Sequence, residues 1–295
     1  MNQYIKSSPI TPIAEYNNIY NVYDISPTVL GRGTFGSVRE CTHRELGMKF
    51  AVKSIDKLKM TRQDAVRVKR EVQILKAVDH PNVVQMVDFF EDEDYVHIVT
   101  EICTGGELFD LIVDSATGNG CLSEDQAILI VKTLLESVEY LHSKDIVHRD
   151  IKPENLLFSS SDEEVTSVKL IDFGLAFKHG INDRNMTEKV GTPHYISPEV
   201  LAGSYDRSCD IWAIGIVCYI LLCGYFPFDG DTTDEILDSV YVGRFTFASP
   251  EWDYVSDEAK DFICSLLTRD PSKRSTIREA LKSPWINGHD DFCIK

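Results

Sequence analysis

The 295-residue chain lacks the paired cysteines that would mark a zinc site or a disulfide framework. Its eight cysteines are scattered, and no two of them form a C-x-x-C motif. The amino terminus also lacks the apolar segment of a secretory signal, and its second residue is Asn2, where N-myristoylation requires glycine. These absences favour a reducing, intracellular setting, and we expect the protein in the cytoplasm or the nucleus.

Long hydrophobic runs are scarce as well. The most apolar stretch, IWAIGIVCYILLCGYFPF, starts at Ile211 and is interrupted by Gly224 and Pro227, so it is too short for a membrane span. We interpret it as a buried helix and expect no membrane partner.

Positive charge is the third shortage. Thirty Lys and Arg residues stand against 47 Asp and Glu residues, which gives a formal net charge of -17. This balance disfavours nucleic acid as a partner and favours cationic ligands such as basic peptides. The hydrophobic fraction of 43% is ordinary for a soluble protein, and the length suits one large domain or two closely apposed ones.

The residue patterns predict an α+β fold with a β-rich front lobe and a helical back lobe. Residues 1–22 resemble an extension that need not be ordered. Alternating strand patterns and one helix, in which Val66, Val72 and Leu75 have helical spacing, fill residues 23–102. Residues 103–286 are mainly helical, with a hinge near residues 101–106, and residues 287–295 form a short tail.

Two local patterns define parts of the back lobe. Ser123 and Gln126 form a capping box before a helix whose apolar stripe includes Ile130 and Leu134. Residues 155–158 and 167–173 are expected to be short strands, joined by an exposed turn at residues 159–166.

Two motifs in the front lobe point to nucleotide phosphates. GRGTFGSV, which contains Gly31, Gly33 and Gly36, is ambiguous alone, but it continues into a strand pattern instead of a helix and so favours a hairpin lid over phosphates. One hairpin later, Lys53 lies in AVK, and Glu71 follows in the predicted helix. A lysine that holds phosphates must itself be held, which a helix-borne glutamate can do.

HRDIKPEN at residues 148–155 and DFG at residues 172–174 complete a larger pattern. With these motifs, the chain resembles eukaryotic protein kinases from about Tyr23 to Ile286. The resemblance implies a bilobal kinase fold and transfer of the ATP γ-phosphate to protein hydroxyls.

The resemblance also implies a role for each matching residue. Asp150 would accept the proton of the substrate hydroxyl, Lys152 would neutralise the γ-phosphate, and Lys53 would hold the α- and β-phosphates. Asn155 and Asp172 would bind Mg²⁺, for which Mn²⁺ can substitute. The residues expected to bind ATP are Leu30, Gly31, Arg32, Gly33, Thr34, Phe35, Gly36, Ser37, Val38, Ala51, Lys53, Glu71, Glu101, Cys103, Glu107 and Leu157.

Family structure implies supporting contacts as well. Asp210 would anchor an apolar stack that includes His148 and Phe173, and Glu199 would form a buried ion pair with Arg274.

Several segments resemble the calcium/calmodulin-dependent kinase group, and most closely the catalytic domain of plant and protist calcium-dependent protein kinases. Lys152 in DIKPEN is the serine/threonine form of the loop. Glu107 and Glu154 would attract an arginine three residues before the target, whereas Ile220 replaces the acid of kinases that demand two arginines. We therefore expect protein substrates with a basic motif.

Calcium-binding D-x-D-x-D-G loops are absent from the sequence. The chain is either an excised catalytic domain or a member that never had the calcium module. Regulation by calcium or calmodulin would then act only through segments absent from this chain.

The segment MTEKVGTPHYISPE contains the predicted activation switch. Thr192 would hydrogen-bond Asp150 or Lys152, and Glu188 stands four residues earlier, where many kinases carry an activating phosphate. Glu188 would pair with Arg149 as a permanent substitute for that phosphate, which leaves Thr187 as a secondary site.

Three alternatives belong to other classes. An inactive scaffold of the same fold usually loses the residues that match Lys53, Asp150 or Asp172, and all three are present here. Small-molecule kinases lack the GTPHYISPE segment, and a dinucleotide-dependent oxidoreductase would need a helix after Gly36.

Overall fold

The computed structural model describes residues 18–33, 35–118, 121–160, 167–179 and 185–288. The chain splits into two compact units: Met1–Val66 with Met86–Ile102, and Arg67–Gln85 with Cys103–Lys295. Residues 67–85 thus group with the helical part, whereas the sequence placed them with the strands. The reason is a pair of backbone bonds, Val84 N–H to Leu170 O at 3.0 Å and Leu170 N–H to Asn82 O at 2.9 Å.

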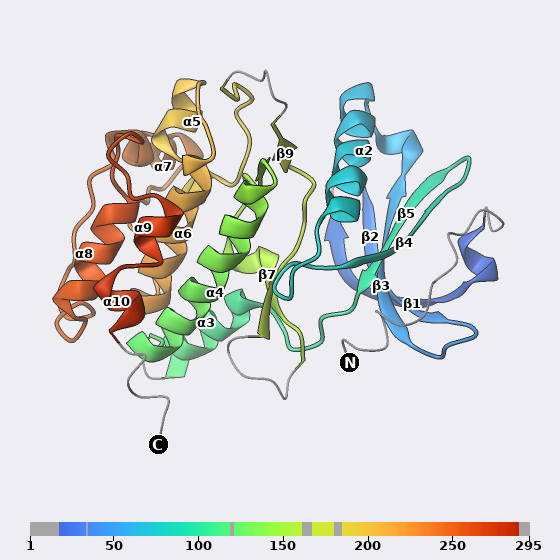
Figure 1. Cartoon of the computed structure of the whole chain (residues 1–295), viewed down its shortest axis with the longest axis horizontal. Helices are drawn as coiled ribbons and strands as arrows, with labels where there is room; N and C mark the ends of the chain where they lie inside the picture. Colours follow the sequence, from blue (N-terminus) through green and yellow to red (C-terminus); the bar gives the residue numbers. More distant parts are fainter. Residues whose placement is uncertain (1–17, 34, 119–120, 161–166, 180–184, 289–295) are drawn as a thin grey trace. The chain divides into compact units, whose positions relative to one another are not determined.

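An antiparallel five-stranded sheet forms the first unit (Figure 1). Its strand order is β1-β2-β3-β5-β4. The strands are β1 Tyr23–Gly33, β2 Gly36–His43, β3 Lys49–Asp56, β4 Met86–Glu91 and β5 Tyr95–Glu101. Alternating side chains such as Phe50, Val52 and Val99 are buried in one core cluster, as period-two patterning requires.

The packed structure begins before Tyr23, where the sequence placed the domain boundary. A short 3₁₀ turn, η1 Ile19–Asn21, precedes the sheet, and Ile19 and Val22 belong to the same core cluster as Phe50. Their apolar side chains gain from burial against the sheet, so residues 18–22 are part of the first unit. Residues 1–17 lie outside the described part.

The second unit is mainly helical (Figure 1). Its helices are α3 Leu108–Gly118, α4 Glu124–Ser143, α5 Pro198–Ala202, α6 Ser208–Cys223, α7 Thr233–Val242, α8 Asp257–Leu266, α9 Ile277–Ala280 and α10 Pro284–Asn287, together with most of α2 Arg62–Ala77. Two small antiparallel pairs accompany them, β6 Ile146–Val147 with β9 Phe177–Lys178 and β7 Leu156–Phe158 with β8 Val168–Leu170. Helix α6 packs against α4 and α8 and is buried along almost its whole length, which confirms the buried helix predicted there.

Most local predictions of helices hold, and one needs correction. The capping box of Ser123 and Gln126 is present, and Ile130 and Leu134 are buried. Val66, Val72 and Leu75 lie in α2, as their spacing predicts, although Val66 is 56% exposed. The expected helix over residues 276–286 is divided into α9 and α10, because Ser283 caps a new helix that starts at Pro284.

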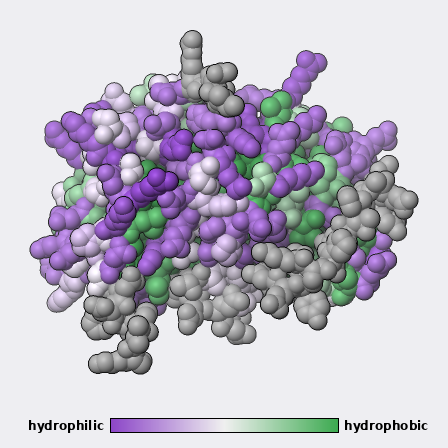
Figure 2. Space-filling model, in the orientation of Figure 1, coloured by the Kyte–Doolittle hydropathy of each residue, from purple (hydrophilic) through white to green (hydrophobic). Residues whose placement is uncertain are grey.

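Strands β7 and β8 confirm the predicted pair, whereas residues 161–166 of the connecting turn lie outside the description. Within the described residues, no helix is both long and apolar enough to cross a membrane. The face drawn in Figure 2 is mostly hydrophilic, as the high content of charged residues leads one to expect.

Candidate active site

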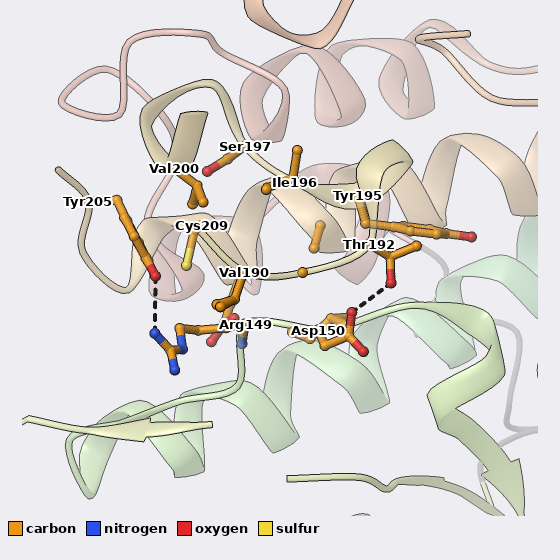
Figure 3. Close-up of a pocket in the computed structure, with 14 residues that line it drawn as sticks. Arg149, Asp150, Val190, Thr192, Tyr195, Ile196, Ser197, Val200, Tyr205 and Cys209 are labelled. Carbon is orange, nitrogen blue, oxygen red and sulfur yellow. Dashed lines mark hydrogen bonds between the residues drawn. The ribbon is translucent and has the colours of Figure 1, made fainter. Parts of the chain in front are cut away.

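The side chains of Thr192 and Lys152 contact the carboxylate of Asp150. Thr192 Oγ1 donates to Asp150 Oδ1 at 2.8 Å (Figure 3). Lys152 Nζ lies 3.0 Å from Asp150 Oδ2. Lys152 Nζ also donates to Thr192 Oγ1 at 2.8 Å. Both predicted bonds of Thr192 are therefore present, and they form a closed triangle that fixes Asp150 between a hydroxyl and an ammonium group.

Helix α6 holds the segment that carries Asp150. The fully buried carboxylate of Asp210 accepts hydrogen bonds from the backbone N–H groups of His148 at 2.9 Å and Arg149 at 2.8 Å. Burial alone would raise the pKa of Asp210, but the hydrogen bond from His142 Nε2 at 2.8 Å and the charges nearby lower it. The carboxylate therefore stays ionised and anchors the segment, as predicted.

The backbone next to Asp150 is strained at Arg149, whose N–H group bonds to Asp210. Arg149 adopts a φ of 70°, a left-handed conformation that costs a non-glycine residue free energy. The two bonds from Asp210 offset this cost. His148 packs edge-on against Phe173 with a ring separation of 5.0 Å, which confirms their predicted contact.

Glu188 is held by two arginines. Arg149 Nη2 lies 3.4 Å from Glu188 Oε2, as predicted, and Arg67 of α2 donates a hydrogen bond to Glu188 Oε1. Burial alone would raise the pKa of Glu188, but the bond from Arg67 and the charges of both arginines lower it. Tyr205 adds a third link, since its hydroxyl donates to the Glu188 carbonyl at 2.6 Å and accepts from Arg149 Nη1 at 3.1 Å.

A second predicted ion pair lies close to the start of α6, where Arg274 Nη1 also donates to Ser208 O at 2.9 Å. Arg274 is buried and meets Glu199 through two parallel bonds, Nη1 to Oε1 at 2.5 Å and Nη2 to Oε2 at 2.9 Å. This bidentate geometry confirms the predicted pair and attaches α5 to the segment before α9.

The predicted metal ligands provide oxygen atoms. Asn155 Nδ2 donates to the Asp150 carbonyl at 2.8 Å and to Asp150 Oδ2 at 3.1 Å, so the amide is fixed in one orientation. Asp172 has a φ of 57°, and its Oδ1 accepts from Gly174 N–H at 3.2 Å. Oxygen donors suit Mg²⁺, which is commonly bound by one or two carboxylates together with phosphates and water. The described residues contain no cluster of three or more His, Cys, Asp or Glu that could hold a metal ion.

Acidic side chains cluster where the sequence predicts contacts with a substrate peptide. Glu107 forms an isolated bridge with Leu157 of β7. Its pKa is raised by burial and by the neighbouring charges of Asp110 and Glu154. Glu107 and Glu154 therefore do lie close together, and Asp110 adds a third acid that the sequence analysis did not single out.

The first unit contains many of the residues predicted to bind ATP. The strand register places Gly31 opposite Val38, Val38 opposite Lys53, and Lys53 opposite Ile98. Leu30, Arg32, Gly33, Phe35, Ser37, Ala51 and Glu101 lie in or beside the same strands, and Thr34 is outside the described residues.

Gly36 packs closely against the backbone of β3. A Cβ atom on Gly36 would lie 1.8 Å from the backbone oxygen of Ser54. Gly36 is therefore required by close strand packing, whereas a Cβ on Gly33 would meet nothing within 4 Å. A Cβ on Gly31 would likewise have only one ordinary contact, with Val38 Cβ at 4.0 Å, and the phosphate role of the three glycines stays a prediction.

The remaining predicted residues are in the second unit. Asp150, Lys152 and Asn155 are joined as described above, and Asp172 bonds to Gly174 N–H. Glu71 is buried in α2, and Cys103 starts the unit after β5. The sequence analysis missed Arg67, Tyr205 and His142. Arg67 precedes Glu71 by one helical turn on α2, so helical spacing was the one signal that could have found it.

Comparisons with known proteins agree with this geometry. The family model "Protein kinase domain" matches residues 26–286. The chain is 44% identical over 269 residues to calcium-dependent protein kinase 3 of Plasmodium yoelii yoelii, covering 91% of this chain and 49% of that protein. It is 42% identical over 283 residues to calcium-dependent protein kinase 5 of Plasmodium falciparum, covering 95% of this chain and 48% of that protein.

A plant protein gives a similar match. Calcium-dependent protein kinase 7 of Arabidopsis thaliana is 44% identical over 268 residues, covering 90% of this chain and 48% of that protein. The chain thus spans about half the length of these relatives. With the family model matched over nearly all of the described residues, the chain belongs to the protein kinase domain family.

Proposed function

We propose that this chain is an ATP-dependent serine/threonine protein kinase. The observation that supports it most is the triangle of Asp150, Lys152 and Thr192. Asp150 accepts the proton of a substrate hydroxyl, and Lys152 neutralises charge on the transferred phosphoryl group. Phosphoryl transfer needs mainly positioning and charge neutralisation, both of which this triangle supplies.

The predicted nucleotide-binding residues have the chemistry that ATP and its metal ion require. Lys53 and the backbone of the Gly31–Val38 hairpin suit the phosphates, and Asn155 and Asp172 suit Mg²⁺, or Mn²⁺ in its place. Held by these two residues, Mg²⁺ would supply positive charge that neutralises the phosphates. The fixed amide of Asn155 orients its own oxygen before any ligand arrives.

An assay of radiolabelled phosphate transfer to a basic peptide tests this function. We expect Asp150→Asn to lower the transfer rate by about 10²–10⁴-fold, the usual contribution of a positioned base, without weakening ATP binding. Asp257→Asn changes an aspartate that is 96% exposed and serves as the matched control. A wild-type protein that binds ATP and transfers nothing would favour the inactive scaffold.

We further propose that substrates carry a basic residue upstream of the target. The cluster of Glu107, Asp110 and Glu154 supports this, as does the net charge of -17. A peptide array checks it, with arginine at the third position before the target as the expected preference. Equal use of acidic peptides would contradict the proposal.

Glu188 is proposed to replace an activating phosphate. Its charge of -1 already engages Arg149 and Arg67, whereas a phosphate would bring about -1.5 to -2. Phosphatase-treated protein should keep most of its activity, and Glu188→Ala should lose much of it. The reverse result would assign the switch to Thr187, which is exposed.

The relatives are named for a dependence on calcium. We propose that transfer by the residues of this chain does not itself require calcium. Activity that persists in excess EGTA with Mg²⁺ present would support this, and loss of activity that added calcium restores would contradict it.

A further inference from the structure

Ser197 introduces a buried hydroxyl group without a protein partner. It is the N-cap residue of α5, yet its side chain makes no capping bond, and the residue is 1% exposed. Among the described residues, no donor or acceptor lies within hydrogen-bonding distance of its Oγ atom. A buried hydroxyl that loses its bonds to water and gains none is unfavourable, so this group calls for a partner.

The hydroxyl is an addition to the family motif. Protein kinases carry A-P-E at this point, and this chain carries Ser197-Pro198-Glu199. Because Pro198 and Glu199 keep their motif identities, and Glu199 keeps its bond to Arg274, the backbone of the motif needs no hydroxyl here. The group therefore has to be explained by its immediate surroundings.

Those surroundings include a small cavity within the second unit. It is lined by Ser197 together with Arg149, Asp150, Thr192 and Cys209, among others (Figure 3). It offers about 20 Å³ to the centre of a water-sized sphere. One water needs at least about 10–15 Å³ by this measure, so the cavity has room for a single water molecule.

We propose that one ordered water molecule binds in this cavity and accepts a hydrogen bond from the Ser197 hydroxyl. Its own hydrogen atoms would point to acceptors of the lining, where the segment of residues 190–197 faces Asp150 and the start of α6. Ser197 thereby becomes a positioning residue, which acts through the water on the segment that presses Thr192 against Asp150. Only this effect on transfer rests on the proposed function.

A crystal structure of the protein at a resolution that shows ordered water tests the site directly. We expect density about 2.5–3.0 Å from Ser197 Oγ, the range of O–H···O hydrogen bonds. An occupied site supports the proposal, and a site without density overturns it.

The change in Tm of Ser197→Ala, measured by thermal unfolding, should have opposite signs with and without the bound water. If the water is bound, the variant removes one of its partners and lowers Tm; if the hydroxyl is simply unpaired, its removal raises Tm. Ser208→Ala is the matched control, because Ser208 Oγ is also buried and unpartnered among the described residues but lines no part of this cavity. We expect Ser208→Ala to raise Tm.

The kinetic consequence separates positioning from general destabilisation. We expect Ser197→Ala to lower kcat severalfold at a temperature where it is fully folded, with the KM for ATP unchanged. An unchanged kcat would overturn the positioning role. Should the wild-type protein transfer no phosphate, the proposed function fails, while the density and Tm measurements still test the water site.

Discussion

Glu188 shows how single residues connect distant parts of the second unit. Its carboxylate joins Arg67 of α2 to Arg149 beside the proposed catalytic aspartate. We expect Arg67→Ala to reduce activity in the wild-type background and to have little further effect in Glu188→Ala. Kinetic double-mutant cycles should give a coupling of about 0.5–1 kcal/mol, since both side chains are about one-third exposed and solvent screens the pair.

The control for this cycle is Lys69→Ala, which removes an exposed cation from the same helix. If the losses of activity in Arg67→Ala and Glu188→Ala were additive, the two side chains would be in contact without any functional coupling.

His97 makes the first unit sensitive to acid. It is 3% exposed and bonded through Nδ1 to Ser54 Oγ at 2.9 Å; burial lowers its pKa, which the charge of Asp92 opposes in part. The unfolded chain, with a histidine pKa of about 6.5, therefore binds the proton more readily than the folded one. The buried, neutral His97 therefore contributes fully to stability above about pH 6.5. Its contribution is lost as the pH falls from there toward the lowered pKa of the folded state.

Denaturant unfolding at a series of pH values measures this effect. His97→Phe keeps a ring against Tyr95 but cannot titrate, so its loss of stability below pH 6.5 should be smaller than that of the wild type. Equal losses in the two proteins would exclude His97 as the sensitive group.

At the scale of elements, one carboxylate links three helices. Glu124, in the first turn of α4, accepts from Ser256 N–H at 2.8 Å, Ser256 Oγ at 2.6 Å and Trp285 Nε1 at 2.8 Å. Ser256 caps α8, and Trp285 is buried in α10. We expect Glu124→Ala to lower the free energy of unfolding by about 1–3 kcal/mol, because it leaves the buried donor of Trp285 and the half-buried donors of Ser256 unpaired.

Urea unfolding measures this loss. Glu258→Ala removes an exposed acid from the first turn of α8 and should change the stability by no more than about 0.5 kcal/mol. Similar losses in both variants would show that the links from Glu124 add nothing beyond a charge near a helix terminus.

At the scale of the whole molecule, the charge balance should govern peptide binding. A net charge of -17 attracts a basic peptide over distances that salt screens, since the Debye length falls to about 10 Å at 0.1 M. We expect the KM of an arginine-containing peptide to rise with ionic strength, whereas the KM of a peptide without basic residues stays nearly constant. If the two KM values depended on salt in the same way, charge attraction would not contribute to binding of the basic peptide.

Features that depend on neighbours along the chain could be predicted from the sequence. The motifs at residues 148–155 and 172–174 identified the family, and the capping box of Ser123 and Gln126 marked the start of α4, because a helix end and a catalytic loop are written in consecutive residues. Strand alternation likewise indicated the sheet of the first unit.

Contacts between residues far apart in the sequence could not be predicted in this way and are seen only in the folded chain. Arg67 and Glu188 are 121 positions apart, and no local pattern pairs them. The grouping of residues 67–85 with the helical unit, the close approach of Gly36 to Ser54 and the cavity beside Ser197 were equally invisible in the sequence. Such contacts are set by how side chains fill a shared core, which depends on the packing of all the elements together and not on the order of residues within any one of them.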